Sequence, residues 1–201
     1  MPYLLAPYPR LPLRRAGRGL AIAGQRLTEV ERVPDSIYVA ECELGRGIFA
    51  ARAIRKGEIV LIFRGRRFDR DDPIHHTPDA SLLLQTGSRT YILPEAPSVY
   101  VNHSCDPSAG LVGNRRLVAL RDILPGEQVT FDYSTSMDDG LWSLQCLCGH
   151  RECRGLIEDF RHLPRLVQQY YLDLGVVQGF IARRYRRQPG QDGALADRAI
   201  A

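Results

Sequence analysis

The closely spaced cysteines near residue 150 constrain this chain more than any other feature of its sequence. Cys146, Cys148 and Cys153 fall within eight residues, although the 201-residue chain contains only five cysteines. Thiols at this spacing are typical of structural zinc sites, in which four cysteine or histidine ligands surround the metal as a tetrahedron. The segment supplies three ligands, so the fourth must come from elsewhere in the chain.

Three residues are candidates for the fourth ligand. His150 lies inside the same short loop, where reaching a metal shared with its neighbours strains the backbone. Cys42 and Cys105 are the two other cysteines, and Cys105 belongs to the segment Asn102-His-Ser-Cys-Asp-Pro. Recruitment of Cys105 would fasten the cysteine-rich segment onto the preceding part of the chain.

Length and composition predict one globular domain with appendages. The chain has 201 residues, of which 44% are hydrophobic and 25% charged, as in ordinary soluble domains. No run approaches the roughly 18–20 apolar residues that span a bilayer, and the N-terminus lacks the apolar core of a signal peptide. We therefore expect no membrane partner and a cytoplasmic location, or a nuclear one if the source is eukaryotic. Thiols stay reduced and available for metal there.

Charge is distributed unevenly along the chain. Residues 1–34 carry a net charge of +4 and residues 161–187 carry +5, whereas residues 35–160 carry −4. An acidic centre favours a cationic ligand, and basic ends can contact nucleic acid or other polyanions. Solvated surface charge is the simpler interpretation of the arginine runs.

Short apolar, β-branched runs between glycine and proline turns predict many short strands, followed by a helix. The polar stretch 66–78 holds two prolines and predicts a surface loop. Apolar side chains at three- and four-residue steps from Leu163 to Leu174, before Gly175, predict a helix that packs on the domain, and the pattern continues to Tyr185. The predicted strands are 36–40, 44–50, 59–63, 81–85, 90–93, 117–120 and 128–131.

Four motifs in this order resemble a known family. They are Gly45-Arg-Gly with Phe49-Ala-Ala-Arg, Asn102-His-Ser-Cys-Asp-Pro, Gly126-Glu-Gln-Val-Thr-Phe-Asp-Tyr133, and Cys146-x-Cys148-x4-Cys153. Over residues 36–157 the chain resembles the SET-domain protein lysine methyltransferases that carry a post-SET zinc motif. The resemblance implies a mainly β fold, the SET-type β-clip, in which the Asn102–Cys105 segment forms a pseudoknot.

The same resemblance divides the chain and implies its cofactors. S-adenosylmethionine would be the methyl donor, and a protein or peptide lysine the substrate. The zinc would be structural, with Cys105, Cys146, Cys148 and Cys153 as its ligands. The parts are an extended or loosely packed lead-in (1–34), the SET domain (36–135), the post-SET zinc motif (142–157), a C-terminal helical extension (158–187) and a disordered tail (188–201).

The resemblance also implies which residues bind the cofactor. These are the backbone around Gly45, Arg46, Gly47 and Phe49, together with Asn102, His103 and Tyr133. Glycine lacks a Cβ, so Gly45 and Gly47 allow a close approach of the backbone to a ligand or a positive φ. A simple tight turn would explain the two glycines equally well without the other motifs.

Tyr133 is the expected catalytic residue, and Phe131 the expected determinant of methylation multiplicity. Methyl transfer requires an uncharged lysine amine, and neutralising an amine of pKa about 10.4 at pH 7 costs about 4 kcal/mol. A narrow apolar channel lowers this cost because burial disfavours the charged form, and a phenol at its inner end orients the amine. Phe131 offers no hydroxyl to hold a water beside the amine, which by resemblance predicts di- or trimethylation. Candidate channel walls, each equally explained as core, are Tyr91, Tyr100 and Trp142.

Two features, Ser108 and the arginine-rich ends of the chain, support a different class of function, and a further departure bears on the substrate. Ser108 stands where the family usually has asparagine, and residues 96–101 lack the pattern of histone-directed members. A catalytically inactive SET-like module that binds a peptide or polyanion is therefore the alternative. A nucleic-acid-binding zinc protein is a third hypothesis, although Cys-x-Cys-x4-Cys lacks the ligand spacing of common zinc fingers. The sequence does not predict the substrate protein or the oligomeric state.

Overall fold

A computed structural model describes residues 34–186 of the chain. The predicted disordered tail and almost all of the predicted lead-in therefore lie outside the described residues. Within residues 34–186, no helix is long and apolar enough to cross a membrane.

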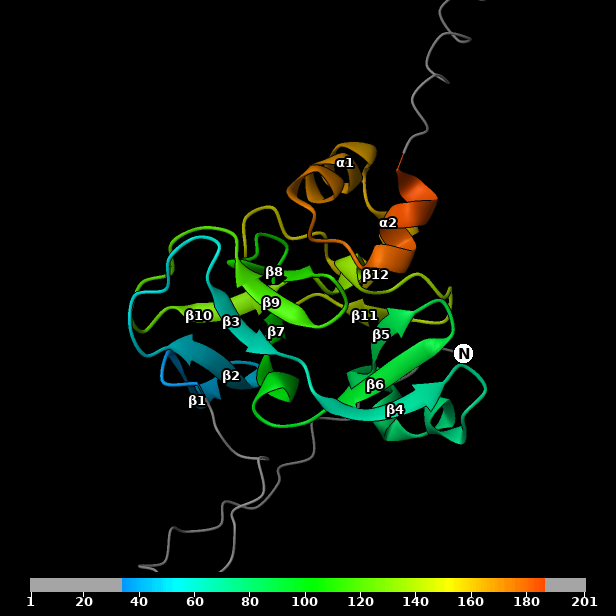
Figure 1. Ribbon diagram of the computed structural model, residues 1–201, viewed down its shortest axis with the longest axis horizontal. Coiled ribbons are helices and arrows are strands. Elements are labelled where there is room, and N and C mark those ends of the chain that lie inside the picture. The colour runs from blue at the N-terminus through cyan, green and yellow to red at the C-terminus, as the bar shows by residue number, and fades with distance from the viewer. Residues whose placement is uncertain (1–33, 187–201) are drawn as a thin grey trace, which may run out of the picture.

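The described part is mainly β, as predicted, and its strands form four small sheets (Figure 1). One sheet has the order β1-β2-β10-β7, the second β3-β9-β8, the third β4-β6-β5, and the fourth pairs β11 with β12. The bounds are β1 Ile37–Cys42, β2 Gly45–Ala50, β3 Ile59–Ile62, β4 Gly65–Asp69, β5 Leu84–Gly87, β6 Thr90–Pro94, β7 Asn102–His103, β8 Ala109–Val112, β9 Arg116–Ala119, β10 Gln128–Phe131, β11 Ser143–Gln145 and β12 Leu156–Glu158.

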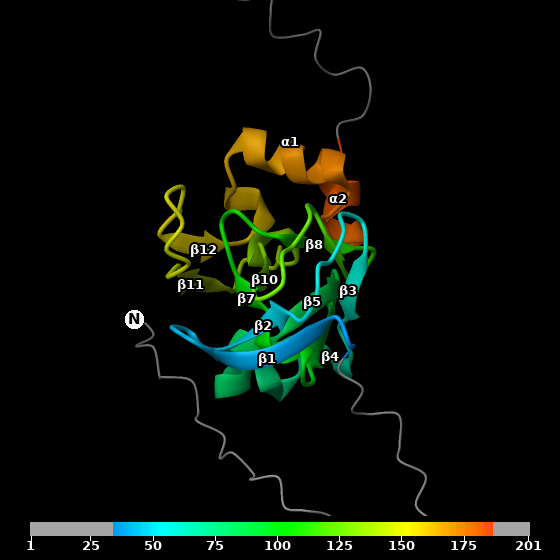
Figure 2. The same cartoon turned by 90° about the vertical axis from the view of Figure 1, so that its left-hand side faces the viewer.

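Two α-helices follow the strands and lie together along one side of them, as both views show (Figures 1 and 2). They are α1 Arg165–Leu174 and α2 Gly179–Tyr185. Gly175 ends α1 in the left-handed conformation with φ 69°, so the glycine stop predicted from the sequence is confirmed. The described residues also form five short 3-10 helices in the connections between these elements: η1 Pro73–His76, η2 Pro78–Leu82, η3 Ser98–Tyr100, η4 Tyr133–Thr135 and η5 Phe160–His162.

The pairing of β7 with β10 positions the candidate site. These strands run parallel, with Asn102 opposite Thr130 and His103 opposite Phe131. The pairing joins segments about thirty residues apart and places the Asn102-His103 pair beside the turn that holds Tyr133. Two motifs that are separate in the sequence therefore form one structural unit.

The surface loop predicted for residues 66–78 is wrong in its first part. Strand β4 occupies Gly65–Asp69 and pairs with β6, with Phe68 opposite Tyr91. It lies at the edge of its sheet, Arg66 and Arg67 are exposed, and only Phe68 is buried. An edge strand needs few apolar side chains, so it leaves little signal in the sequence.

The helix predicted from Leu163 onward is present, and it buries only part of the expected apolar set: Leu163, Val167 and Tyr171 pack inward. Leu166 is 87% exposed and Tyr170 is 57% exposed, whereas Tyr171 is only 2% exposed. Tyr171 packs with Phe160 and Ile181 in a cluster that joins α1 and α2 to the strands. The main core is a separate cluster formed by the first sheets, with Phe131 inside it and Tyr133 packed against it.

Candidate active site and cysteine cluster

Tyr133 lies where β10 ends and the 3-10 helix η4 begins. Asp132 caps this helix, because its Oδ1 accepts a hydrogen bond from the Ser134 amide at 3.1 Å. The Tyr133 hydroxyl donates to the Val101 carbonyl at 2.8 Å. Its phenol is therefore held over the strand that carries Asn102 and His103.

Aromatic rings surround the Tyr133 side chain. Its centroid lies 4.9 Å from that of Phe131, 5.3 Å from His103 and 6.3 Å from Trp142. Tyr133 remains partly exposed, whereas Phe131 is 4% exposed. These rings offer apolar contact and negative ring faces to an amine that approaches the exposed part of Tyr133.

Of the three residues predicted to line the lysine channel, Trp142 lies beside Tyr133, whereas Tyr100 and Tyr91 pack in hydrophobic clusters. Trp142 lies beside Tyr133, and its Nε1 is buried without a hydrogen-bond partner among residues 34–186. Tyr100 packs against the main core, as Tyr133 does. Tyr91 instead packs with Phe68 and Leu83, and its hydroxyl donates to Asp139 at 2.8 Å.

The glycine motif lies on β2 against Asn102. The Asn102 side-chain amide donates to the Arg46 carbonyl at 3.1 Å. A Cβ at Gly47 would lie 3.2 Å from Asn102 Nδ2 and 2.3 Å from Gln128 Nε2, so a larger residue would have to displace the Gln128 amide and press on Asn102. Gly45 has φ +97°, and the space beside it is open within 4 Å. Gly45 therefore shows the positive φ, and Gly47 the close approach, that the sequence predicted for these two glycines.

The other two predicted residues of this motif have aromatic neighbours. Arg46 places its guanidinium 4.0 Å from the centre of the Tyr100 ring. Phe49 stacks on Tyr38 with 5.7 Å between centroids. Both residues lie on β2, and the Arg46 carbonyl is the acceptor for the Asn102 amide.

His103 connects Tyr133 to the cysteines. Its Nδ1 accepts a hydrogen bond from the Tyr133 amide at 3.3 Å, and its Nε2 lies 3.3 Å from Cys105 Sγ. Burial lowers the pKa of His103 to about 4, with Asp132 opposing and Arg154 reinforcing this shift, so the ring is neutral at pH 7. Since Nδ1 acts as the acceptor, the proton of the neutral ring lies on Nε2, which then donates to the sulfur.

Cys105 comes together with the distant cysteine-rich segment. The sulfur atoms of Cys105 and Cys146 are 3.7 Å apart. Ligand atoms of His103, Cys105, Cys146 and Cys148 all lie within 4.8 Å of one another. In a tetrahedral zinc site with Zn–S bonds of about 2.3 Å, sulfur atoms are about 3.8 Å apart, so the donor set fits this metal.

Cys153 lies at the border of this group, and the other two candidate ligands lie away from it. The Cys153 sulfur is 4.0 Å from the Cys146 carbonyl and accepts from the Gly155 amide at 3.4 Å. Cys42 Sγ instead accepts from Asn102 Nδ2 at 3.5 Å. His150 pairs with Asp106 at 3.1 Å.

Burial raises the pKa values of the cysteine thiols, whereas hydrogen bonds from backbone amides lower them. Burial raises the pKa of Cys146 and of Cys105. Burial also opposes ionisation of Cys148, but hydrogen bonds from the backbone amides of Cys105 and His150 outweigh it and lower the pKa of Cys148 to about 7. Amides directed at sulfur are typical of thiolate ligands, because they stabilise the negative charge.

A buried carboxylate that sequence reasoning missed links these elements. Asp132 has no exposed side-chain surface; its Oδ1 pairs with Arg154 at 2.8 Å, and its Oδ2 accepts from the Tyr171 hydroxyl at 3.0 Å. Arg154 directly follows Cys153, and Tyr171 lies on α1. Asp132 therefore connects the turn of Tyr133 with both the cysteine-rich segment and the C-terminal helix. The only sequence signal was an arginine beside a cysteine and an aspartate before the predicted catalytic tyrosine.

Ser108, the departure from the family pattern, is well satisfied. It is 1% exposed; its hydroxyl donates to the Gln128 carbonyl at 3.3 Å and accepts from the Thr130 amide at 3.1 Å. The serine therefore braces β10 directly, and the loop is not left without support.

Comparison with known proteins shows similarity to the SET domain. Residues 45–134 match the model of the SET domain. The chain is similar to the histone-lysine N-methyltransferase trithorax of Drosophila virilis, with 24% identity over 161 residues that cover 72% of this chain and 4% of the relative. It is 28% identical over 126 residues to human histone-lysine N-methyltransferase 2B, covering 55% of this chain and 5% of that protein. The methyltransferase domain of human SETMAR aligns with 20% identity and a TM-score of 0.47, covering 57% of this chain and 54% of that one.

These matches show that residues 45–134 are similar to the SET domain, as the motifs predicted. The chain spans only a small fraction of the length of these curated relatives.

Proposed function

We propose that this protein is an S-adenosylmethionine-dependent protein lysine N-methyltransferase with a structural zinc. The juxtaposition of Asn102-His103 with Tyr133, through the parallel pairing of β7 and β10, is the observation that carries the proposal. Related proteins named as histone-lysine N-methyltransferases support the reaction class. The substrate is a lysine of a protein or peptide.

Tyr133 and the rings around it would prepare the lysine for transfer. The amine must lose its proton, and apolar walls such as Phe131 favour its neutral form by desolvation. The Tyr133 hydroxyl, fixed by the Val101 carbonyl, would orient the nitrogen lone pair toward the methyl group. Phe131 provides no hydroxyl for a water, so dimethyl- or trimethyllysine remains the predicted product.

The cofactor would be held by the glycine motif of β2, beside Asn102. Open space beside Gly45 and the Arg46 carbonyl, which already accepts from Asn102, fit the amino-acid part of this ligand. S-adenosylmethionine supplies an electrophilic methyl group on a sulfonium when bound. Asn102 would keep the β2 backbone in place while the cofactor enters, because it bonds to the Arg46 carbonyl.

The zinc would be bound by Cys105, Cys146, Cys148 and Cys153. His103 is the competing fourth ligand by distance, but its Nε2 carries the proton that donates to Cys105. A protonated nitrogen cannot bind the metal, so we assign His103 as the hydrogen-bond donor to the thiolate and Cys153 as the fourth ligand. The metal would fix the cysteine-rich segment beside Tyr133.

The activity is tested with purified protein, labelled S-adenosylmethionine and a protein extract, followed by mass spectrometry of the modified lysines. Tyr133→Phe is expected to lower the transfer rate by about a hundredfold while calorimetry still detects cofactor binding. Tyr170→Phe, the matched control on the exposed face of α1, should leave the rate unchanged. Equal rates for wild type and Tyr133→Phe would refute the catalytic role of Tyr133.

The binding module is the other outcome of this experiment. Cofactor binding without turnover on any extract would favour it, whereas absence of both would contradict a methyltransferase altogether. The well-bonded Ser108 removes one of the reasons for that alternative. Nucleic-acid binding through the basic ends, and the cytoplasmic or nuclear location, remain predictions.

A further inference from the structure

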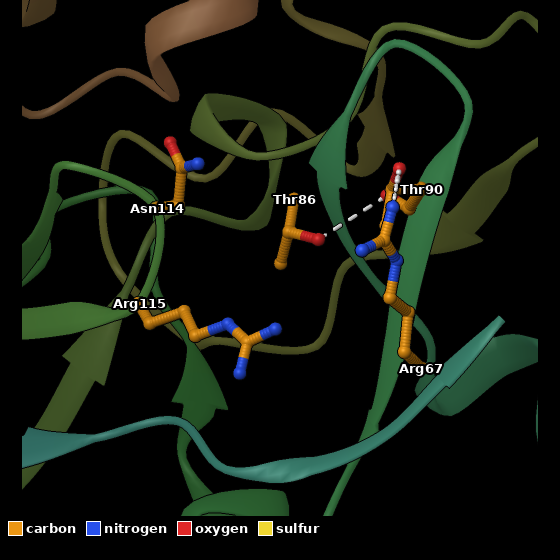
Figure 3. A pocket seen from close by; sticks show the side chains of 5 residues that line it. All are labelled: Arg67, Thr86, Thr90, Asn114 and Arg115. Carbon is orange, nitrogen blue, oxygen red and sulfur yellow. Dashed lines mark hydrogen bonds between the residues drawn. The ribbon is translucent and has the colours of Figure 1, made fainter. Parts of the chain in front are cut away.

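The structure contains a basic pocket that the proposed methyl transfer does not use. It has a volume of about 280 Å³ and is lined by Arg67 of β4, Thr86 of β5, Thr90 of β6, and Asn114 and Arg115 of the β8–β9 turn. Figure 3 shows the guanidinium groups of Arg67 and Arg115 on opposite sides of Thr86. None of the lining residues belongs to the cysteine cluster or to the rings around Tyr133.

The positive charge of this pocket is not neutralised by the described residues. Neither Arg67 nor Arg115 forms a salt bridge within residues 34–186, and no carboxylate lines the pocket. Arg67 Nη2 donates a hydrogen bond to Thr90 Oγ1 at 3.4 Å. Within residues 34–186, the two guanidiniums form no other side-chain hydrogen bond. Two cations that share a concave space repel each other, so an anion between them would gain electrostatic energy from both.

The walls of the pocket are held in place from behind. Gln178, which has no exposed surface, donates to the Gln85 carbonyl at 2.9 Å and to the Asn114 carbonyl at 3.1 Å. The Arg115 carbonyl accepts from the Phe63 amide at 2.8 Å. These bonds fix the backbone beside Thr86, at Asn114 and at Arg115, so a ligand would meet a largely preformed site.

We propose that this pocket binds the phosphate group of a small phosphorylated molecule. Two guanidiniums match the charge of a phosphate dianion better than that of a single carboxylate, and each presents a planar set of N–H donors to phosphate oxygens. The Thr86 and Thr90 hydroxyls and the Asn114 amide add neutral hydrogen-bonding groups around the same space. The volume lies just below the range of about 300–1,000 Å³ for small-molecule sites, which favours a compact ligand.

Neighbouring arginines provide matched controls for a test by calorimetry on the full chain. Inorganic phosphate is titrated at constant ionic strength into wild type, Arg67→Gln and Arg115→Gln. The controls Arg66→Gln and Arg116→Gln remove the same charge one residue away, from positions that do not line the pocket. Saturable binding by wild type is expected, weakened about tenfold or more in each pocket variant and unchanged in each control.

A second arm separates a small ligand from nucleic acid. Glycerol phosphate should compete with inorganic phosphate for the same site. A short single-stranded oligonucleotide whose binding falls equally in all four variants would reveal a diffuse basic surface and refute the pocket, as would the absence of saturable phosphate binding by wild type. Circular dichroism of each variant confirms that it is folded. The result does not depend on methyl transfer, so this inference and the proposed function succeed or fail separately.

Discussion

Removal of a single oxygen atom from Tyr171 should destabilise the protein measurably. Its phenol is 2% exposed and donates to Oδ2 of Asp132, a carboxylate with no exposed side-chain surface. Burial, followed by the negative charge of Asp132, raises the pKa of Tyr171, so the phenol keeps its proton and remains a donor. Tyr171→Phe leaves the ring in its cluster and deprives the carboxylate of one of its partners.

The size of the effect follows from the charge of the acceptor. Loss of a hydrogen bond to a charged group costs about 1.5–3 kcal/mol. For a chain of this length each kcal/mol lowers Tm by about 2–4 °C, so a cost of about 2 kcal/mol predicts a fall of about 4–8 °C. Tyr170→Phe removes the same atom from a neighbouring ring that is 57% exposed, and its cost should stay within about 0.5 kcal/mol.

Urea unfolding of the two variants and wild type measures this difference. A double-mutant cycle with Arg154→Met extends it, because Arg154 and Tyr171 share the same carboxylate and their effects should not add. Equal stabilities for Tyr170→Phe and Tyr171→Phe, or additive effects in the cycle, would refute the role assigned to Asp132.

Three further outcomes are expected. Cys105→Ser should lose bound zinc by elemental analysis while Cys42→Ser retains it, because only Cys105 lies beside Cys146; full zinc content in Cys105→Ser would contradict the ligand assignment. Gly47→Ala should cost about 1–3 kcal/mol by urea unfolding and weaken cofactor binding, since its Cβ would displace the Gln128 and Asn102 side chains; a wild-type result would show that the contact is soft. Burial raises the pKa of Asp159 above its ordinary value, so its contribution to the free energy of unfolding should fall as pH rises above about 4. Asp159→Asn should remove this decrease when the free energy of unfolding is measured between pH 4 and 7. An unchanged decrease in the variant would assign the effect to another group.

The sequence predicted best where a local signal and the fold agree. Strand β10 occupies residues 128–131 as expected, because a Pro-Gly-Glu turn is followed by the β-branched pair Val129-Thr130. The proximity of Cys105 to Cys146 was also expected from the family motifs, and the structure brings the two sulfurs together.

Prediction failed where a residue's role depends on distant partners. Helical periodicity located α1, but it could not choose between adjacent faces, and Tyr171 faces inward because its hydroxyl reaches Asp132. The edge strand β4 buries only Phe68 and so lacks an apolar pattern. His103 Nδ1 is an acceptor because the Tyr133 amide points at it, and no sequence pattern predicts the position of that amide.

The contacts of Asp132 with both Arg154 and Tyr171 determine where the protein can be truncated. The match to the SET-domain model ends at residue 134. The hydrogen bond from Tyr171 to Asp132 extends the contacts of this domain to helix α1. A fragment trimmed to the matched residues would keep Asp132 and the Ser134 amide, but it would lose the Arg154 guanidinium and the Tyr171 hydroxyl. Such a fragment would carry an unmatched charge in its interior, and a failure to express it would say nothing about catalysis.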